Sequence, residues 1–295
     1  MGSDRSEVTA ADGRRLILHV SGPEDGEPLI THNGTPETGP MFEPQVEAGA
    51  ERGLRHISYS RPGYGESDRR PGRTVADAAA DVAAIADALE LDRFFTVGWS
   101  GGGPHTLACA ALLPERVRAA ASIAGVAPHD AEGLDWTAGM GAENLEEFSA
   151  AEAGDEALRT FLDGERDSFG DVTGEDVIES LGDLVSEADR KALTGEFGEH
   201  LAGNAREALS TGIWGWFDDD MAFLANWGFD LGKIDVPVAI WQGGDDRFVP
   251  AAHGDWLAEH VSGATAHLRP EEGHLSLQIL AYGEILYGLL DAAKG

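Results

Sequence analysis

Ser100 lies in a glycine-rich segment whose composition suits a nucleophile for acyl transfer. The segment at 98–102 reads Gly-Trp-Ser-Gly-Gly, follows an apolar run at 94–97 and precedes a helix-like stretch at 104–113. A strand that turns sharply into a helix strains the backbone at the serine and leaves little room for side chains two residues away. The N–H groups at the start of the helix favour the negative oxygen that forms during acyl transfer. The pattern therefore predicts a reactive serine at a strand-to-helix turn.

A serine hydroxyl is a weak nucleophile, so this chemistry also needs a base and an acid. A histidine takes the proton, and a carboxylate holds that histidine in the productive tautomer. Downstream of Ser100, Asp246 follows one predicted strand and His274 follows the next. Open α/β sheets place their sites in loops at the carboxyl ends of such strands. We expect Ser100 to be the nucleophile, His274 the base and Asp246 the orienting acid, with Asp245 as the alternative acid.

Three other histidines occur in the same part of the chain. The pattern places His253 and His260 on an exposed helix and His267 within a strand. None of these positions is in a loop over the serine, so we prefer His274 as the base.

Acyl transfer also needs two backbone N–H groups that hold the oxyanion. Gly101, the residue after the nucleophile, can supply one of them. The loop at 31–36 can supply the second from Thr35, because Gly34 and the proline at 36 favour a turn that aims this N–H inward. A simple turn with no catalytic role is the alternative for this loop.

A sheet must position these segments. In the N-terminal third, short apolar runs alternate with helical segments, which predicts a mainly parallel sheet with helices on both faces. The predicted strands span residues 14–20, 28–32, 54–59, 94–97, 117–124, 237–241 and 265–268. Helices are predicted at 42–52, at 75–91 after an N-cap at Thr74, at 104–113, at 251–260 and after His274.

Between about 129 and 233 the apolar strand runs stop and acidic helical segments replace them. This stretch has 26 acidic and 6 basic residues, so it holds 20 of the 32 net negative charges. Its last part contains a dense group of aromatic residues, which pack a core or wall a pocket. From this region we expect Trp214, Trp216 and Phe217 in the substrate pocket. We expect Trp99 and Gly34 to join them there.

The charge balance excludes several classes of partner. The 295 residues include 53 acidic and 21 basic ones, a net charge of -32, which repels nucleic acid and anionic membranes.

The start of the chain has no apolar signal segment, and there is no run of about 18 apolar residues, so we expect a cytoplasmic protein. The single cysteine, Cys109, rules out an internal disulfide and a cysteine-based metal site. We expect no metal and no organic cofactor, and a monomer or homodimer that binds a small molecule.

Four separated motifs together resemble the α/β-hydrolase superfamily over nearly the whole chain. They are the Asn-Gly-Thr-Pro loop at 33–36, the Gly-Tyr-Gly-Glu-Ser turn at 63–67, the serine segment at 98–102, and the Asp246 loop with Gly-His at 273–274. Before the second motif, Ser60 departs from the aspartate that is common in the family. The resemblance implies a mainly parallel, eight-stranded α/β-hydrolase sheet with an inserted helical cap. Residues 1–128 and 234–295 would form the core and 129–233 the cap.

The leading hypothesis is a serine hydrolase that cleaves a small ester or lactone through an acyl-enzyme intermediate. The oxyanion loop is also similar to that of proline iminopeptidases, so an aminopeptidase of this type is an alternative. The same triad is known on this fold for carbon–carbon bond hydrolysis and for cofactor-free perhydrolysis, and the fold does not choose among them. A non-catalytic small-molecule receptor is the alternative from a different class.

Overall fold

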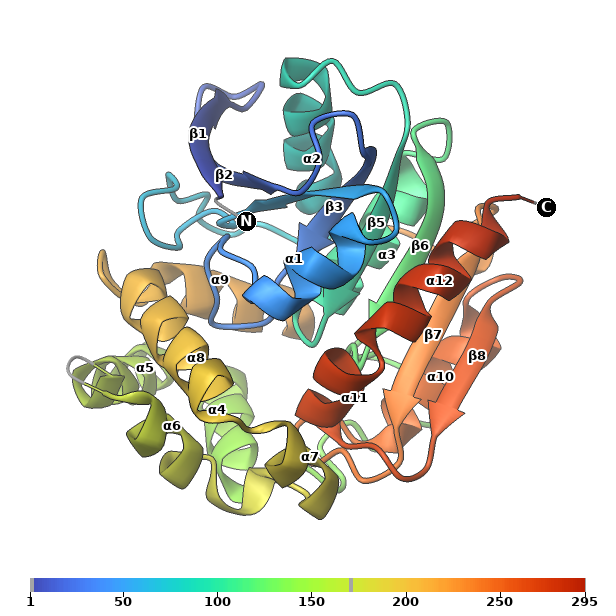
Figure 1. The fold of residues 1–295 in the computed structure, drawn as a ribbon. Coiled ribbons are helices and arrows are strands. Elements are labelled where there is room, and N and C mark those ends of the chain that lie inside the picture. The colour runs from blue at the N-terminus through green and yellow to red at the C-terminus, as the bar shows by residue number, and fades with distance from the viewer. Residues whose placement is uncertain (1–2, 170–171, 295) are drawn as a thin grey trace.

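An eight-stranded sheet forms the centre of the structure, a computed structural model that describes residues 3–169 and 172–294. The strand order is β1-β2-β4-β3-β5-β6-β7-β8 (Figure 1). The first strands pair antiparallel, β1 with β2 and β2 with β4, and all other neighbours are parallel. The prediction of a mainly parallel sheet is therefore confirmed. The strands are β1 (Asp4–Thr9), β2 (Arg15–Ser21), β3 (Glu27–His32), β4 (Leu54–Tyr59), β5 (Phe94–Trp99), β6 (Val117–Ile123), β7 (Val238–Gly243) and β8 (Thr265–Arg269).

Helices cover both faces of the sheet, as the alternation of strands and helices predicts. Apolar residues of α2, α3 and α10 form one core cluster with the sheet, and those of α11 and α12 form a second. Helix α1 packs beside α12 and β4. These helices are α1 (Glu43–Ala50), α2 (Asp77–Ala88), α3 (Gly102–Leu112), α10 (Ala251–His260), α11 (His274–Leu280) and α12 (Tyr282–Ala292).

A run of helices separates β6 from β7 and lies beyond the carboxyl ends of the strands (Figure 1). Residues of α4, α5, α8 and α9 form a third apolar cluster together with Tyr64, which comes from the segment after β4. The layer corresponds to the helical insertion expected at 129–233, although residues 170–171 of that range, and residues 1–2 and 295 of the expected core, lie outside the described residues. The boundaries of the two units stay a prediction. The helices are α4 (Ala142–Ala153), α5 (Asp155–Phe169), α6 (Gly174–Ser180), η1 (Gly182–Leu184), α7 (Glu187–Ala192), α8 (Gly195–Ala208), α9 (Trp214–Leu224) and η2 (Leu231–Lys233).

Three local features differ from the sequence-based expectations. Strand β1 was missed, because its residues are almost all exposed and lack an apolar alternation. Thr74 is not the N-cap of α2: its N–H and hydroxyl instead donate to Asp77, at 2.7 and 3.1 Å, and the helix begins only there. The segment after residue 273 forms two helices, α11 and α12, rather than one.

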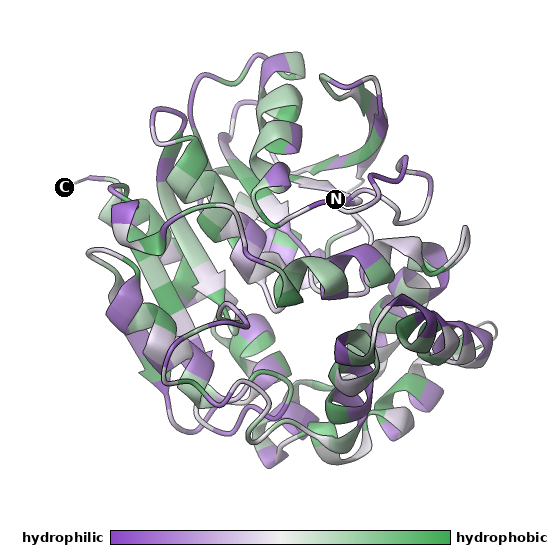
Figure 2. Cartoon of the chain, turned by 180° about the vertical axis from the view of Figure 1, so that it is seen from behind, coloured by the Kyte–Doolittle hydropathy of each residue, from purple (hydrophilic) through white to green (hydrophobic). Residues whose placement is uncertain are grey.

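The hydropathy of the chain follows these layers. Hydrophobic residues predominate along the parallel strands, whereas the helices beyond their carboxyl ends alternate between hydrophobic and hydrophilic segments (Figure 2). In the described ranges, no helix has the length and apolar character needed to cross a membrane.

Candidate active site

Ser100 sits at the turn between β5 and α3 with a φ of 54°. This left-handed conformation is strained for a residue with a side chain and is typical of functional positions. The turn requires the glycines two residues away, because a Cβ at Gly98 would collide with the carbonyl oxygen of Gly102, and a Cβ at Gly102 with that of His32. The glycine pattern of the sequence thus has a steric cause.

Asp246 and His274 form a buried pair in the loops after β7 and β8. His274 Nδ1 and Asp246 Oδ2 are 2.8 Å apart. Because the carboxylate accepts this hydrogen bond, Nδ1 carries the proton and Nε2 is left as the basic nitrogen. The other carboxylate oxygen of Asp246 accepts from the N–H groups of Phe248 and Val249, at 2.9 and 2.8 Å. The alternative acid, Asp245, is about half exposed and lies near Arg247 instead.

The pKa of Asp246 reflects this environment. Burial raises the pKa of this carboxyl, while the charge and hydrogen bond of His274 act in the opposite direction. A buried carboxylate with one dedicated imidazole partner is the arrangement that orients a general base.

His274 is held between two aromatic rings beside the serine. Its ring centroid is 5.1 Å from that of Trp99, the residue before Ser100, and 4.6 Å from that of Phe248. The indole N–H of Trp99 also donates to the carbonyl oxygen of His274, at 3.3 Å. These contacts place the histidine loop against the end of β5 that carries the serine.

Thr35 and Gly101, the expected oxyanion donors, face each other across the turn. A Cβ on Gly101 would collide with Thr35 Oγ1, and both residues line the same cavity as Ser100. Among the described residues, no acceptor takes a hydrogen bond from the backbone N–H of either one. Two free N–H donors are therefore available next to the serine.

Arg61 fixes the loop that carries Thr35, a role that the sequence analysis missed. The guanidinium is 2% exposed and donates to the carbonyl oxygens of Asn33 and Gly34, the latter at 2.8 Å. The only signal in the sequence was its place two residues before the turn motif at 63–67.

Asp219, from α9, is the counterion of this arrangement and was not expected either. Its fully buried carboxylate accepts from Arg61, Tyr64 and Thr35 Oγ1 at 2.7, 2.7 and 2.9 Å, and Arg73 lies 2.6 Å away. Burial would raise the pKa of Asp219, but the charges of Arg61 and Arg73 hold it well below its ordinary value. An ionised aspartate of the helical layer thus anchors the side chain of Thr35.

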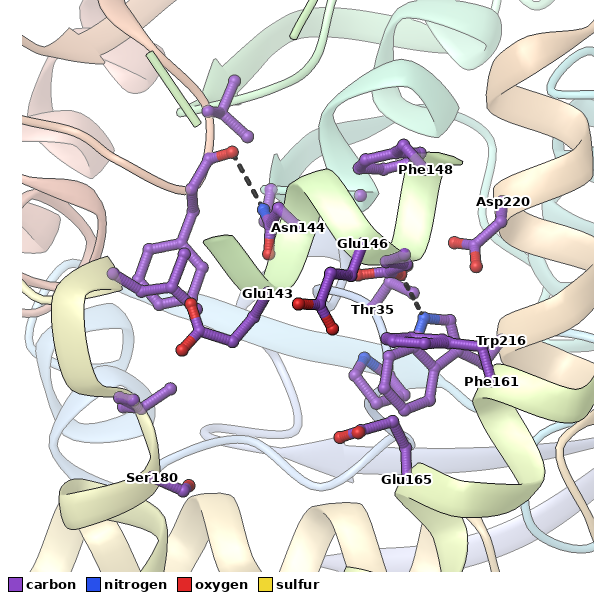
Figure 3. Close-up of a pocket in the computed structure, with 18 of the residues that line it drawn as sticks. Thr35, Glu143, Asn144, Glu146, Phe148, Phe161, Glu165, Ser180, Trp216 and Asp220 are labelled. Atoms are coloured by element: carbon purple, nitrogen blue, oxygen red, sulfur yellow. Dashed lines mark hydrogen bonds between the residues drawn. The ribbon is translucent and has the colours of Figure 1, made fainter. Parts of the chain in front are cut away.

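A cavity of about 300 Å³ opens over Ser100, beneath α4, α5 and α9 (Figure 3). Ser100, Thr35 and Gly101 lie at one end of its wall, and aromatic rings make up much of the rest. This volume accommodates a small to medium-sized organic molecule. The aromatic lining residues are Phe148, Phe161, Phe169, Trp216, Phe223 and Phe248.

Four of the five expected pocket residues do not line this cavity. Trp216 does, but the ring of Trp214 stacks instead under the Arg69 guanidinium, 3.9 Å from its centroid, and Phe217 packs edge-on against Trp214. Trp99 and Gly34 lie against each other below the serine turn. The period of α9 turns these neighbours to different sides, so only part of the aromatic group reaches the cavity.

His253 corrects a second expectation, because it is fully buried rather than exposed. Its Nδ1 accepts from the N–H of Ala127 at 3.1 Å, and its Nε2 lies 2.8 Å from the carbonyl oxygen of Trp136. Burial lowers the pKa of His253 to about 4. This histidine is a structural link between α10 and the segment after β6.

Carboxyl groups are concentrated in the cavity wall, and none of the described lining residues is basic. Trp216 Nε1 donates to Glu147 at 2.5 Å. The carboxylate of Asp220 points toward the same cavity (Figure 3). Burial raises the pKa of Glu147 to about 7. Burial and the charge of Glu147 raise the pKa of Asp220 well above its ordinary value. The acidic lining residues are Glu143, Glu146, Glu147, Glu165 and Asp220.

Comparison with known proteins agrees with this architecture. A non-heme chloroperoxidase from Streptomyces lividans is 32% identical over 282 residues, which cover 95% of each chain. A pimeloyl-acyl-carrier-protein methyl ester esterase from Chromobacterium violaceum is 27% identical, over 88% of this chain and 91% of its own. The crystal structure of the enol-lactonase from Burkholderia xenovorans LB400 has the same fold, with a TM-score of 0.68 at 20% identity over 97% of this chain and 100% of its own. A sequence model described as the alpha/beta hydrolase fold matches residues 27–278. With the sheet order and the serine turn, this match shows that the chain belongs to the alpha/beta hydrolase fold family.

Proposed function

We propose that the protein is a serine hydrolase that cleaves small carboxylic esters or lactones through an acyl-enzyme on Ser100. The observation that carries the proposal is the buried pair of His274 and Asp246, 2.8 Å apart, packed against the strand end that presents Ser100. The methyl ester esterase among the relatives supports an ester as the substrate class.

The reaction follows from the positions of these groups. Ser100 Oγ attacks the carbonyl carbon of the ester while its proton moves to His274 Nε2, and the imidazolium that forms is stabilised by Asp246. The carbonyl oxygen becomes an oxyanion that accepts from the N–H groups of Thr35 and Gly101. His274 then gives the proton to the departing alcohol oxygen. A water molecule, deprotonated by His274, attacks the acyl-enzyme and releases the acid and the free serine.

A chain-length series of p-nitrophenyl esters tests this proposal. Wild type is expected to hydrolyse the short members, which fit a cavity of about 300 Å³. Ser100→Ala is expected to lower kcat by at least about 10³-fold, because the nucleophile is lost while binding and the oxyanion donors remain. The unfolding temperature should not change.

Ser149→Ala, at an exposed serine of α4, is the matched control and should hydrolyse the esters at the wild-type rate. Wild-type-like hydrolysis by Ser100→Ala would contradict the proposal.

The same assay should be repeated with hydrogen peroxide added, because a relative is named a chloroperoxidase. Attack of peroxide in place of water on the acyl-enzyme would release a peroxy acid.

An aminopeptidase is the second candidate function, and the carboxyl groups of the cavity favour it. Five acidic side chains and no described basic one line the space over Ser100. A positively charged amine on the acyl side of a substrate would pair with Glu147 and Asp220 there, and its charge would favour their ionised forms.

Two p-nitrophenyl esters of equal shape separate these candidates. One carries a 3,3-dimethylbutanoyl group and the other its trimethylammonio counterpart, whose charge does not titrate. The quantity to compare is kcat/KM of the charged ester divided by kcat/KM of the neutral ester, after both are corrected for spontaneous hydrolysis. If the carboxyls recognise cations, this ratio should rise between pH 6 and 8. In that range Glu147, with a pKa of about 7, loses its proton.

Glu147→Gln should flatten this rise, whereas Glu152→Gln, an exposed glutamate of the same helix, should preserve it. Cleavage of prolyl or alanyl p-nitroanilide would then establish the peptidase activity. A constant ratio together with intact anilides would leave the esterase as the function.

A further inference from the structure

Asp189 lies in the short helix α7, one of the helices between β6 and β7, which we call the cap layer. Its side chain reaches α11, the helix that begins at His274. Its carboxylate is fully buried. Oδ1 accepts from the backbone N–H groups of Leu275 and Ser276, both at 2.8 Å, and Oδ2 accepts from the N–H of His274 at 3.2 Å. These three residues form the first turn of α11. Charge-assisted hydrogen bonds of this kind are stronger than those between neutral groups.

The same carboxylate also caps its own helix. Asp189 Oδ2 accepts from the N–H of Ser186 at 3.3 Å, and Ser186 Oγ accepts from the N–H of Asp189 at 3.1 Å, which completes a capping box at the start of α7. One carboxylate therefore accepts from backbone N–H groups at the starts of two helices, one N–H at α7 in the cap layer and three at α11 in the site.

Gly273 makes this double cap possible. It is the N-cap residue of α11 and has no side chain to cap the helix itself. A Cβ at this position would collide with both Asp189 and Ser186. The Gly-His pair at 273–274 therefore allows α7 to approach closely and lets Asp189 supply the missing cap.

We propose that Asp189 is a positioning residue of the hydrolytic site, which holds the backbone of His274 in the position that lines its ring up with Asp246 and Ser100. The proposal rests on the proposed serine hydrolase function. Catalytic geometry is sensitive to such support, because a shift of about 1 Å can lower the rate about 10²-fold. It follows that the cap layer contributes to the catalytic step itself, through α7, as well as covering the substrate.

The cap layer offers a matched control for the test. Thr173 and Asp176 form the same type of capping box at the start of α6, with Asp176 accepting from the N–H of Thr173 at 2.8 Å. Asp176 is exposed, and within the described part of the chain its hydrogen bonds stay at its own helix end, with Thr173. Asp189→Asn and Asp176→Asn therefore remove the same local charge, but only the first touches α11.

Ester hydrolysis by the full-length protein is the first readout. Asp189→Asn is expected to lower kcat about 10- to 100-fold with KM within about twofold of wild type, because the histidine is displaced while the cavity is kept. Asp176→Asn should retain both parameters. Gly273→Ala is the second variant: its added methyl should push α7 away with the charge intact and lower kcat in the same way.

The low-field proton NMR signal of His274 Nδ1–H, hydrogen-bonded to Asp246, is the second readout. It should shift or broaden in Asp189→Asn and stay unchanged in Asp176→Asn, and it does not require turnover. An unchanged kcat and signal in Asp189→Asn, or an equal loss in Asp176→Asn, would overturn the positioning role. Absence of any ester hydrolysis by wild type would instead overturn the proposed function, while the NMR comparison would still report on Asp189.

Discussion

At the scale of single residues, Asp245 and Asp246 show how much depends on one position in a loop. The two are adjacent in sequence, yet Asp246 is buried against His274 and Asp245 is about half exposed. Only the carboxylate on the histidine can set its tautomer and stabilise the imidazolium.

Asp246→Asn is therefore expected to lower kcat for ester hydrolysis by about 10²- to 10⁴-fold, because an amide does not stabilise the imidazolium. Asp245→Asn should change kcat by less than about twofold. Steady-state kinetics of both variants check this, with circular dichroism to confirm folding. If Asp245→Asn were the impaired variant, the assignment of the acid would be wrong.

The residues that the sequence analysis identified share one property, which is a local signal. Ser100 has its flanking glycines, and His274 and Asp246 follow predicted strands in the expected order. Asp219 and Asp189 have no such signal, and Arg61 has only its place near the turn motif at 63–67. Asp219 lies 158 positions from Arg61, and Asp189 lies 85 positions from His274, so their roles depend on packing between distant segments.

At the scale of elements, α9 links the cap layer to the loop at 31–36 through a buried ion network. Its consecutive aspartates face three environments. Asp219 meets Arg61 and Arg73, both almost fully buried, whereas Asp218 meets Arg69, which is 27% exposed. Asp220 faces the cavity. The three consecutive aspartates of α9 therefore differ in their partners and in their exposure to solvent.

Asp219→Asn is expected to lower the free energy of unfolding by about 3–5 kcal/mol, because it leaves two buried guanidinium groups without their counterion. Asp218→Asn should cost about 1 kcal/mol or less, since solvent screens its partner. Chemical denaturation of the two variants measures the difference. Equal losses would show that the Asp219 network does not hold the layers together.

The elements themselves were predictable where burial leaves an apolar run. Seven of the eight strands were predicted, and β8 is among them although it lies at a sheet edge and is largely exposed, because its apolar residues alternate. The other edge strand, β1, is exposed and has no such alternation. The start of α2 was misplaced because the N–H of Asp77 donates to the backbone carbonyl oxygen of Thr74 rather than to its hydroxyl, and the helix begins only at Asp77. The aromatic residues of α9 were recognisable as a group, but which of them face the cavity depends on how the helix is rotated against its neighbours.

At the scale of the whole molecule, the fold class could be predicted from the sequence, but the shape and lining of the cavity could not. The order of motifs along the chain indicated the family, and the match over residues 27–278 agrees with it. The cavity is walled by the loop at 31–36, the serine turn, α4, α5, α6 and α9 together. No single segment of the sequence determines the shape of the cavity or its acidic lining. Both depend on how the sheet and the helices above it pack together.

The whole fold is also what singles out one serine. The chain has 15 serines, and Ser100 is the one at the strained turn beside His274 and the free N–H groups of Thr35 and Gly101. A fluorophosphonate reacts with a serine that is activated in this way, which gives a test independent of the substrate.

Mass spectrometry of the native protein after incubation with a fluorophosphonate tests directly whether Ser100 is the activated nucleophile. We expect one adduct per chain, mapped to the peptide with Ser100 and absent in Ser100→Ala. An adduct on another serine would show that the nucleophile is assigned wrongly. Folded protein that stays unlabelled would show that Ser100 is not activated and would favour a small-molecule receptor built on the hydrolase fold.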